Sequence, residues 1–222
     1  MDNNSKLIDN SALFKLSYGL FVLTTGDGEK DNGCIVNTAM QITSSPLRIS
    51  IAVNRANYSC QLIEKTGVFN VCTLSQSATM GTFERFGFQS GKDVDKFSGT
   101  AYDKRTANGL RYVSEQVNSV ISGKVFHSYD CGSHMIFIAD VTECFTVSNE
   151  PSVTYQYYFD HIKPAAAKSA QAGGTAASVI GVSAASKRFE CKICGFIYEG
   201  DSLPDDFVCP ICKHGKEDFE EI

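Results

Sequence analysis

Four cysteines near the C-terminus, arranged as two C-x-x-C pairs, restrict what this chain can fold into more than any other feature. The first pair is Cys191 and Cys194, and the second is Cys209 and Cys212, with 14 residues between the pairs. Two thiolates on one tight turn can bind the same ion, and two such turns complete a tetrahedral site of four sulfurs, which suits Zn²⁺ or a single iron ion. The sequence therefore predicts a small metal-binding module, in which zinc would be structural and iron would carry electrons.

The residues around the two pairs resemble those of rubredoxins. Three stretches carry the resemblance, namely 194–198 (CGFIY), 203–212 (LPDDFVCPIC) and 216–219 (KEDF). The segment between the pairs is shorter than in free-standing rubredoxins and closer to the module at the end of rubrerythrins, and Phe207 stands where many rubredoxins have Trp. The resemblance implies one iron ion, with zinc as the alternative, bound by Cys191, Cys194, Cys209 and Cys212.

Charge and composition argue against several function classes. The formal charge is −5, and the segment from Lys187 onward carries nine acidic and five basic residues. The lack of a basic stripe argues against a nucleic-acid partner, and no apolar run reaches the roughly 18 residues that a membrane span needs. Residues 1–9 are polar, without the features of a signal peptide. We therefore expect a cytoplasmic protein without a membrane partner, whose acidic tail suits docking on a basic surface of another protein.

Composition divides the chain into three segments. Residues 1–163 are expected to form one globular domain, residues 164–186 an Ala/Gly/Ser-rich flexible linker, and residues 187–222 the metal module. Five further cysteines lie in apolar or strand-like stretches and, in a reducing compartment, are expected to be buried free thiols. These are Cys34, Cys60, Cys72, Cys131 and Cys144.

The large domain is predicted to be mainly β. Runs of β-branched and aromatic residues bounded by Gly, Pro, Asn and Asp predict strands, and many long strands with few helices favour a closed barrel without open edges. Two short helices are expected, 58–65 after the N-cap Asn57 and 77–86 beginning with a Ser cap. The expected strands cover residues 20–25, 33–43, 47–54, 68–74, 117–128 and 134–147.

Three stretches of this domain resemble the flavin reductase family, with its FMN-binding split β-barrel. They are 18–25 (YGLFVLTT), 32–46 (NGCIVNTAMQITSSP) and 132–141 (GSHMIFIADV). Ala139 stands where the family usually has Gly, and Gly-Ser precedes His134 where an acid is common. The resemblance implies bound FMN, NAD(P)H as electron donor, and a homodimer whose second subunit closes the flavin cleft.

Candidate flavin ligands follow from side-chain chemistry together with this resemblance. The run 37–43 alternates small polar and apolar residues, which fits either an ordinary barrel strand or an edge that offers amides and hydroxyls to a flat ring. The run 54–59 fits either a capped helix beside a surface arginine or a phosphate seat built from helix amides and Arg55. The resemblance places His134, as the candidate catalytic residue, where it orients the hydride donor. The candidate cofactor-binding residues are Asn37, Thr38, Gln41, Thr43, Asn54, Arg55, Asn57 and Ser59.

The two sites together indicate electron transfer. A nicotinamide gives two electrons as a hydride, a mononuclear iron centre takes one, and a flavin can link them. The domain combination resembles the high-molecular-weight rubredoxins of anaerobic bacteria, which implies an NAD(P)H:flavin/rubredoxin oxidoreductase serving a flavodiiron protein that reduces O₂ or NO. Two alternatives stay open: a flavin reductase that supplies a monooxygenase and carries a zinc ribbon, or an electron carrier without a nicotinamide site.

Overall fold

The computed structural model describes residues 10–163, 187–191, 197–209 and 215–221. Contacts divide the chain into two compact units, Met1–Tyr158 (the large unit) and Phe159–Ile222 (the small unit). The expected linker 164–186 and two of the expected metal ligands, Cys194 and Cys212, lie outside the described residues. The domain boundaries expected from composition therefore stay a prediction.

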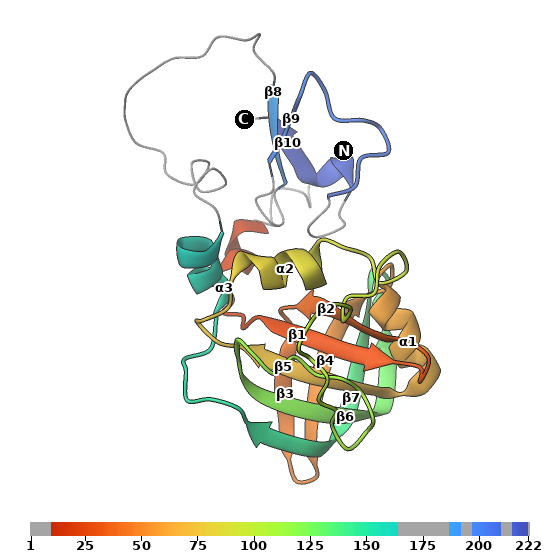
Figure 1. Cartoon of the computed structure of the whole chain (residues 1–222). Coiled ribbons are helices and arrows are strands. Elements are labelled where there is room, and N and C mark those ends of the chain that lie inside the picture. The colour runs from red at the N-terminus through yellow and green to blue at the C-terminus, as the bar shows by residue number, and fades with distance from the viewer. Residues whose placement is uncertain (1–9, 164–186, 192–196, 210–214, 222) are drawn as a thin grey trace. The chain divides into compact units, whose positions relative to one another are not determined.

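β-Strands dominate the large unit, and seven of them form one antiparallel sheet in the order β2-β1-β5-β6-β7-β4-β3 (Figure 1). One core cluster contains side chains from β1, β2, β4, β5 and β7, so strands far apart in the sheet order face the same interior. The sheet is therefore curled into a barrel. Its strands are β1 (Phe21–Gly26), β2 (Asp31–Val36), β3 (Ala39–Ser44), β4 (Leu47–Asn54), β5 (Val68–Leu74), β6 (Val117–Asp130) and β7 (His134–Thr146).

The barrel is split rather than closed. Among the described strands, β2 and β3 stand at the two ends of the sheet order and each pairs with one neighbour. Helix α1 (Tyr58–Thr66) packs against β1, β2 and β4, and its buried residues Cys60 and Ile63 belong to the barrel core. The helix helps to cover the core where the hydrogen-bonded ladder does not close. The expectation of a closed ladder is wrong, whereas the split barrel implied by the family resemblance is confirmed.

Helix α1 forms where its capping residues predict it. Asn57 Oδ1 accepts a hydrogen bond from the Ser59 amide at 3.2 Å, and Gly67 ends the helix in the left-handed region with φ of 70°. Because both signals are local, the sequence places this helix correctly to within a residue. The other helices in the described parts of the chain are α2 (Met80–Gly87), α3 (Tyr155–Tyr157), the 3₁₀ segments Asn10–Lys15 and Lys216–Asp218, and the π-helical turn Tyr158–Ile162.

Long-range contacts change two of the expected elements. The run 33–43, expected as one strand, forms the end of β2 and most of β3 with a break at Asn37 and Thr38. The chain breaks there because β2 pairs with β1, whereas β3 pairs with β4 at the opposite end of the sheet. The second helix begins at Met80 rather than Ser77, because the Ser77 hydroxyl donates to Glu150 Oε2 at 2.5 Å and does not cap the helix.

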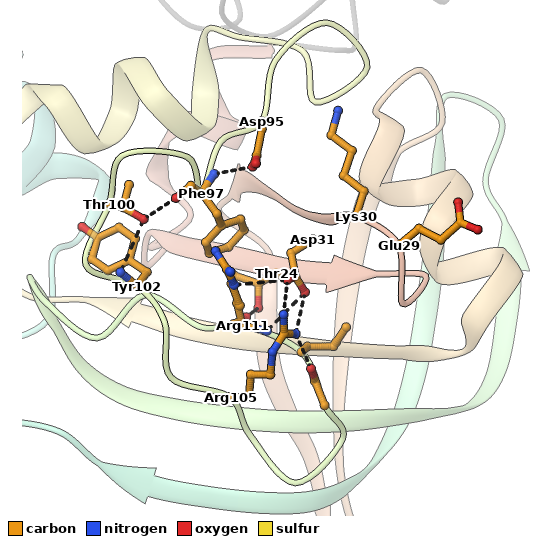
Figure 2. A network of polar contacts seen from close by, with 12 residues as sticks. Thr24, Glu29, Lys30, Asp31, Asp95, Phe97, Thr100, Tyr102, Arg105 and Arg111 are labelled. Carbon is orange, nitrogen blue, oxygen red and sulfur yellow. Dashed lines mark hydrogen bonds and ion pairs between the residues drawn. The ribbon is translucent and has the colours of Figure 1, made fainter.

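A polar network holds the long connection between α2 and β6 against the barrel (Figure 2). The Asp31 carboxylate accepts a hydrogen bond from Arg105 Nη2 at 2.8 Å and lies 3.4 Å from Arg111 Nε. The Thr24 hydroxyl donates to the Arg111 carbonyl at 2.7 Å. A cavity of about 260 Å³ beside the network is lined in part by Asp31 and Arg105. Because these charges already pair with each other, we interpret the network as structural.

The expected burial of the free cysteines is correct for three residues and wrong for two. Cys131 and Cys144 are exposed. Cys131 lies in the turn between β6 and β7. Cys144 lies near the end of β7, and its side chain is exposed to solvent. Apolar neighbours in the sequence indicate a strand, but they do not say which face of the strand is covered. The three buried thiols are Cys34, Cys60 and Cys72.

The small unit contains a three-stranded antiparallel sheet in the order β10-β8-β9. Its strands are β8 (Lys187–Cys191), β9 (Ile197–Gly200) and β10 (Phe219–Glu221). A compact apolar cluster joins Cys191 and Cys209 to Leu203 and Phe219, and Phe207 packs against it. This cluster places two of the expected metal ligands side by side with the aromatic residues of the module.

Candidate functional site

The two segments that carry the candidate flavin ligands and the candidate catalytic residue His134 lie beside one another along strand β4. The Ala52 amide donates to the Thr38 carbonyl at 3.1 Å, and the Thr38 hydroxyl donates to the Ala52 carbonyl at 2.9 Å. Asn54 ends β4 and pairs in register with His134, the first residue of β7. The run 37–43, the run 54–59 and His134 are therefore spatial neighbours.

Strand β3 presents polar groups at an edge of the sheet. Among the described strands it pairs with β4 alone, so its other side faces no strand. Gln41 is exposed and Thr43 is half-buried, and the Gln41 amide donates a long hydrogen bond of 3.4 Å to the Thr43 carbonyl. Such an edge offers amide, hydroxyl and backbone groups and fits a flat heteroaromatic ring such as a flavin. The individual roles of these residues stay predictions.

Arg55 follows β4 directly and is held by the turn between β6 and β7. Its amide donates to the Ser133 carbonyl at 3.0 Å, and its guanidinium Nη1 forms an ion pair with Asp130 Oδ2. Asp130 Oδ1 accepts a hydrogen bond from the Gly132 amide at 2.8 Å. The hydrogen bonds from Arg55 and Gly132 lower the pKa of Asp130, and the Asp130 carboxylate raises the pKa of Arg55. Both side chains are therefore charged at neutral pH.

Internal hydrogen bonds already occupy the start of α1. Asn54 Oδ1 accepts from the amide two residues further on at 2.9 Å, and Asn57 Oδ1 accepts from the Ser59 amide. The Ser59 side chain is fully buried, and its hydroxyl accepts from Asn32 Nδ2 at 2.9 Å. A phosphate at this helix start would therefore meet the Arg55 guanidinium first. The predicted phosphate contact of Ser59 and the predicted cofactor contacts of Asn54 and Asn57 stay predictions. The Ser59 hydroxyl can accept from Asn32 and still donate its own proton to a ligand.

His134 is half-buried at the start of β7, beside the end of β4. Its Nδ1 lies 2.9 Å from Ser133 Oγ. A hydroxyl both donates and accepts, so this neighbour is compatible with either neutral tautomer of the ring. An acid at that position would favour the charged imidazolium instead. The contact thus suits a histidine that orients a hydride donor, and that catalytic role stays a prediction.

Cys191 and Cys209 provide two thiols inside the small unit. Both are fully buried, and Cys191 pairs in register with Phe219 across β8 and β10. Soft thiolates suit iron or zinc, and the surrounding apolar side chains limit the access of solvent to a bound metal. The two donors that the structure describes therefore fit the expected metal centre, and the other two predicted ligands, Cys194 and Cys212, lie outside the described residues.

Both parts of the chain match known domain families. Residues 13–166 match the flavin reductase-like domain, over more than half of the chain. The chain belongs to the flavin reductase-like family. Residues 189–220 match the rubredoxin-like domain of rubrerythrins, and this range contains all four paired cysteines.

Similar proteins combine or share these domains. The high molecular weight rubredoxin of Moorella thermoacetica is 31% identical over 97% of this chain and 100% of its own length. The NAD(P)H ferric-chelate reductase of Archaeoglobus fulgidus is 30% identical over 68% of this chain and 89% of its own length. An NADH:FAD oxidoreductase of Streptomyces globisporus has a TM-score of 0.59 over 69% of this chain and 90% of that chain, at 17% identity. This last similarity shows a shared fold.

The family assignment confirms the resemblance to high-molecular-weight rubredoxins. The protein is an oxidoreductase in which a flavin reductase-like domain is joined to a rubredoxin-like domain. This combination supports a role in electron transfer with a flavin and iron. Separately, no helix in the described parts of the chain is long and apolar enough to cross a membrane.

Sequence reasoning misses three residues that hold the predicted site in place. Asp130 pairs with the candidate phosphate ligand, Asn32 binds the Ser59 hydroxyl, and Ser133 contacts the histidine ring. The Asp-x-Gly pattern at 130–132 marks a turn. Nothing in that pattern points to an arginine 75 residues earlier in the chain. The Arg55–Asp130 contact depends on the pairing of β4 with β7.

Proposed function

We propose that this protein passes electrons from NAD(P)H through FMN to a rubredoxin-type Fe(Cys)₄ centre, and from there to another redox protein. The observation that carries the proposal is the presence of both domains in one chain, together with a relative that is similar over 97% of it. The proposed division places the flavin domain at 1–163, a flexible linker at 164–186 and the iron module at 187–222. The four iron ligands are Cys191, Cys194, Cys209 and Cys212.

The chemistry of the two sites explains why they occur together. Bound FMN supplies the conversion between the two electrons of a hydride and the single electron that one iron ion accepts. In this proposal the β3 edge holds the flavin ring, Arg55 binds the phosphate group, and His134 orients the nicotinamide. The neighbourhood of these segments across β4 supports the assignment.

We include a homodimer in the proposal because apolar side chains are exposed on strands β3 and β6 of the barrel. Met40 on β3 is 64% exposed, and Phe126 and Tyr129 on β6 are 58% and 53% exposed. The Arg48 guanidinium lies 3.7 Å from the centre of the Phe126 ring and so links β4 to this surface. Exposed apolar patches of this kind commonly mark protein interfaces. A second copy of the chain would cover them, and a monomer with full FMN occupancy would refute this part.

The proposed acceptor is a flavodiiron protein that reduces O₂ or NO. The small unit supports a docking role because its acidic residues are exposed, and an acidic surface attracts a partner with a basic one. Association with the acceptor should therefore slow as the salt concentration rises. The exposed acidic residues include Asp201, Asp205, Asp206, Glu217 and Glu220.

Anaerobic stopped-flow spectroscopy of the full chain tests the relay. NADH or NADPH should bleach the flavin absorption first and the iron absorption second, at rates independent of protein concentration because both centres belong to one chain or dimer. The matched variant Cys209→Ser should keep flavin reduction and lose the normal iron spectrum and electron delivery. Iron that is reduced before the flavin would refute the relay. Stoichiometric zinc in protein from iron-replete cells would favour the flavin reductase with a structural tail.

A further inference from the structure

Asp130 makes contacts that resemble those a phosphate oxygen would make. Its Oδ2 pairs with Arg55 Nη1, and its Oδ1 accepts from the Gly132 amide at 2.8 Å. The two side chains of the ion pair are 48% and 55% exposed, so both are accessible to a ligand from solvent. A carboxylate fixed by one backbone amide therefore covers part of the arginine fork that is proposed to bind phosphate.

The neighbouring donors are occupied in the same way. The Ser59 amide at the start of α1 donates to Asn57 Oδ1. The chain thus supplies oxygen atoms of its own to the Arg55 guanidinium and to a helix amide, groups that a phosphate would otherwise bind. Of these internal partners, Asp130 is the charged one, so its competition with a phosphate is electrostatic as well as geometric.

We propose that Asp130 is an internal competitor for the phosphate group of the flavin, which occupies the Arg55 guanidinium when the site is empty and must yield it when FMN binds. This inference rests on the proposed role of Arg55 as the phosphate ligand. It adds a residue that sets how tightly, and how selectively, the site holds a phosphorylated flavin.

The opposite role, in which Asp130 positions Arg55 for the phosphate, predicts the opposite sign. If a half-exposed ion pair only held Arg55 in position, it would add little to the affinity for FMN, because solvent screens both charges. A fixed carboxylate beside a phosphate dianion also adds like-charge repulsion, which scales with both negative charges of the phosphate. Removal of the Asp130 charge should therefore tighten FMN binding rather than weaken it.

The test measures FMN and riboflavin binding by the flavin-free full chain and its Asp130→Asn variant, by quenching of flavin fluorescence. The variant should bind FMN about two- to fivefold more tightly, the range that the coupling energies of exposed ion pairs span. Riboflavin lacks the phosphate, so its affinity should not change. The gain for FMN should shrink as salt is raised, because salt screens exposed charges.

Two further variants separate this inference from the proposed function. Arg55→Ala should weaken FMN binding about ten- to hundredfold, and Asp130→Asn should add much less in that background, because the competitor then has no arginine to occupy. Asp27→Asn is the matched control, since Asp27 forms an ion pair with Lys65 at the other end of α1 and should leave FMN binding unchanged.

Each outcome is decisive. Tighter FMN binding with unchanged riboflavin binding supports the competitor. Unchanged or weaker FMN binding in Asp130→Asn overturns it, as does an equal gain for both flavins, which would indicate a general change of the barrel. If Arg55→Ala binds FMN as tightly as the wild type, the proposed phosphate site itself is wrong, which is a different failure from that of the competitor.

Discussion

Phe219→Ala in the small unit should weaken iron binding strongly and leave flavin binding by the large unit unchanged. Phe219 is 8% exposed, lies opposite Cys191 in the β8–β10 pair, and packs edge-on against Phe207 with ring centroids 5.3 Å apart. Among the described residues of the small unit, it is one of four buried members of this core, and two of the others are cysteines. Few other side chains can compensate for its loss.

The size of the effect follows from the coupling of folding to metal binding. Truncation of a buried Phe to Ala costs about 3–5 kcal/mol, and a module this short depends on its metal to stay folded. Because the metal binds the folded form, the loss appears in the apparent iron affinity. The same energy corresponds to about a hundred- to several thousandfold weaker binding.

The assay follows the loss of the iron absorption in the full chain during titration with a chelator, while the flavin absorption reports on the large unit. Glu221→Ala is the matched control, because Glu221 is on the same strand but forms only an exposed ion pair with Lys187. It should change the midpoint little. An iron midpoint for Phe219→Ala equal to that of the wild type would refute the reasoning, as would an equal loss of flavin.

Three further predictions concern the large unit. Alkylation followed by mass spectrometry should label exposed Cys131 and Cys144 well before Cys72, whose burial raises the pKa of its thiol to about 12 and suppresses the reactive thiolate. Asn70→Ala should lower the free energy of unfolding by about 1–3 kcal/mol in urea, because it leaves a buried serine hydroxyl without its 2.8 Å acceptor; a loss below about 0.5 kcal/mol would contradict this. Hydrogen bonds from Lys65 and the Lys30 amide hold the pKa of Asp27 at about 2 against 3.8, so its contribution to stability is complete above the ordinary value and is lost as the pH falls through about 2. The stability difference between wild type and Asp27→Asn should therefore disappear across that interval, and a difference independent of pH would contradict the assignment.

Elements whose signals are local could be predicted from the sequence. Helix α1 begins after an asparagine cap and ends at a left-handed glycine, and both residues act on neighbours within a few positions. Strands 47–54 and 68–74 match β4 and β5 because each is rich in β-branched residues and has turn residues at its ends. The two C-x-x-C pairs are local as well, and their flanking residues carried the assignment of the small module.

Elements that depend on distant partners could not be predicted in the same way. The run 33–43 is a good strand sequence throughout, and its break at Asn37 arises because β1 and β4 lie at different places in the sheet. Ser77 is a good N-cap residue, but Glu150, 73 residues later, takes its hydroxyl. In both places, contacts with a partner far along the chain outweigh the local preference for a strand or a helix cap, which is worth about 1–2 kcal/mol at most.

The candidate flavin site also contains contacts between residues far apart in the sequence. Buried helix amides cannot be left unsatisfied at low cost, and a half-exposed arginine attracts a nearby carboxylate, so the folded chain supplies oxygen atoms from its own side chains to both groups. Asp130 and Asn57 provide these atoms around Arg55 and α1. A ligand then gains only the difference between its own contacts and those it replaces. In the proposed site, Asp130, which the sequence does not mark, would therefore reduce the affinity that Arg55 provides.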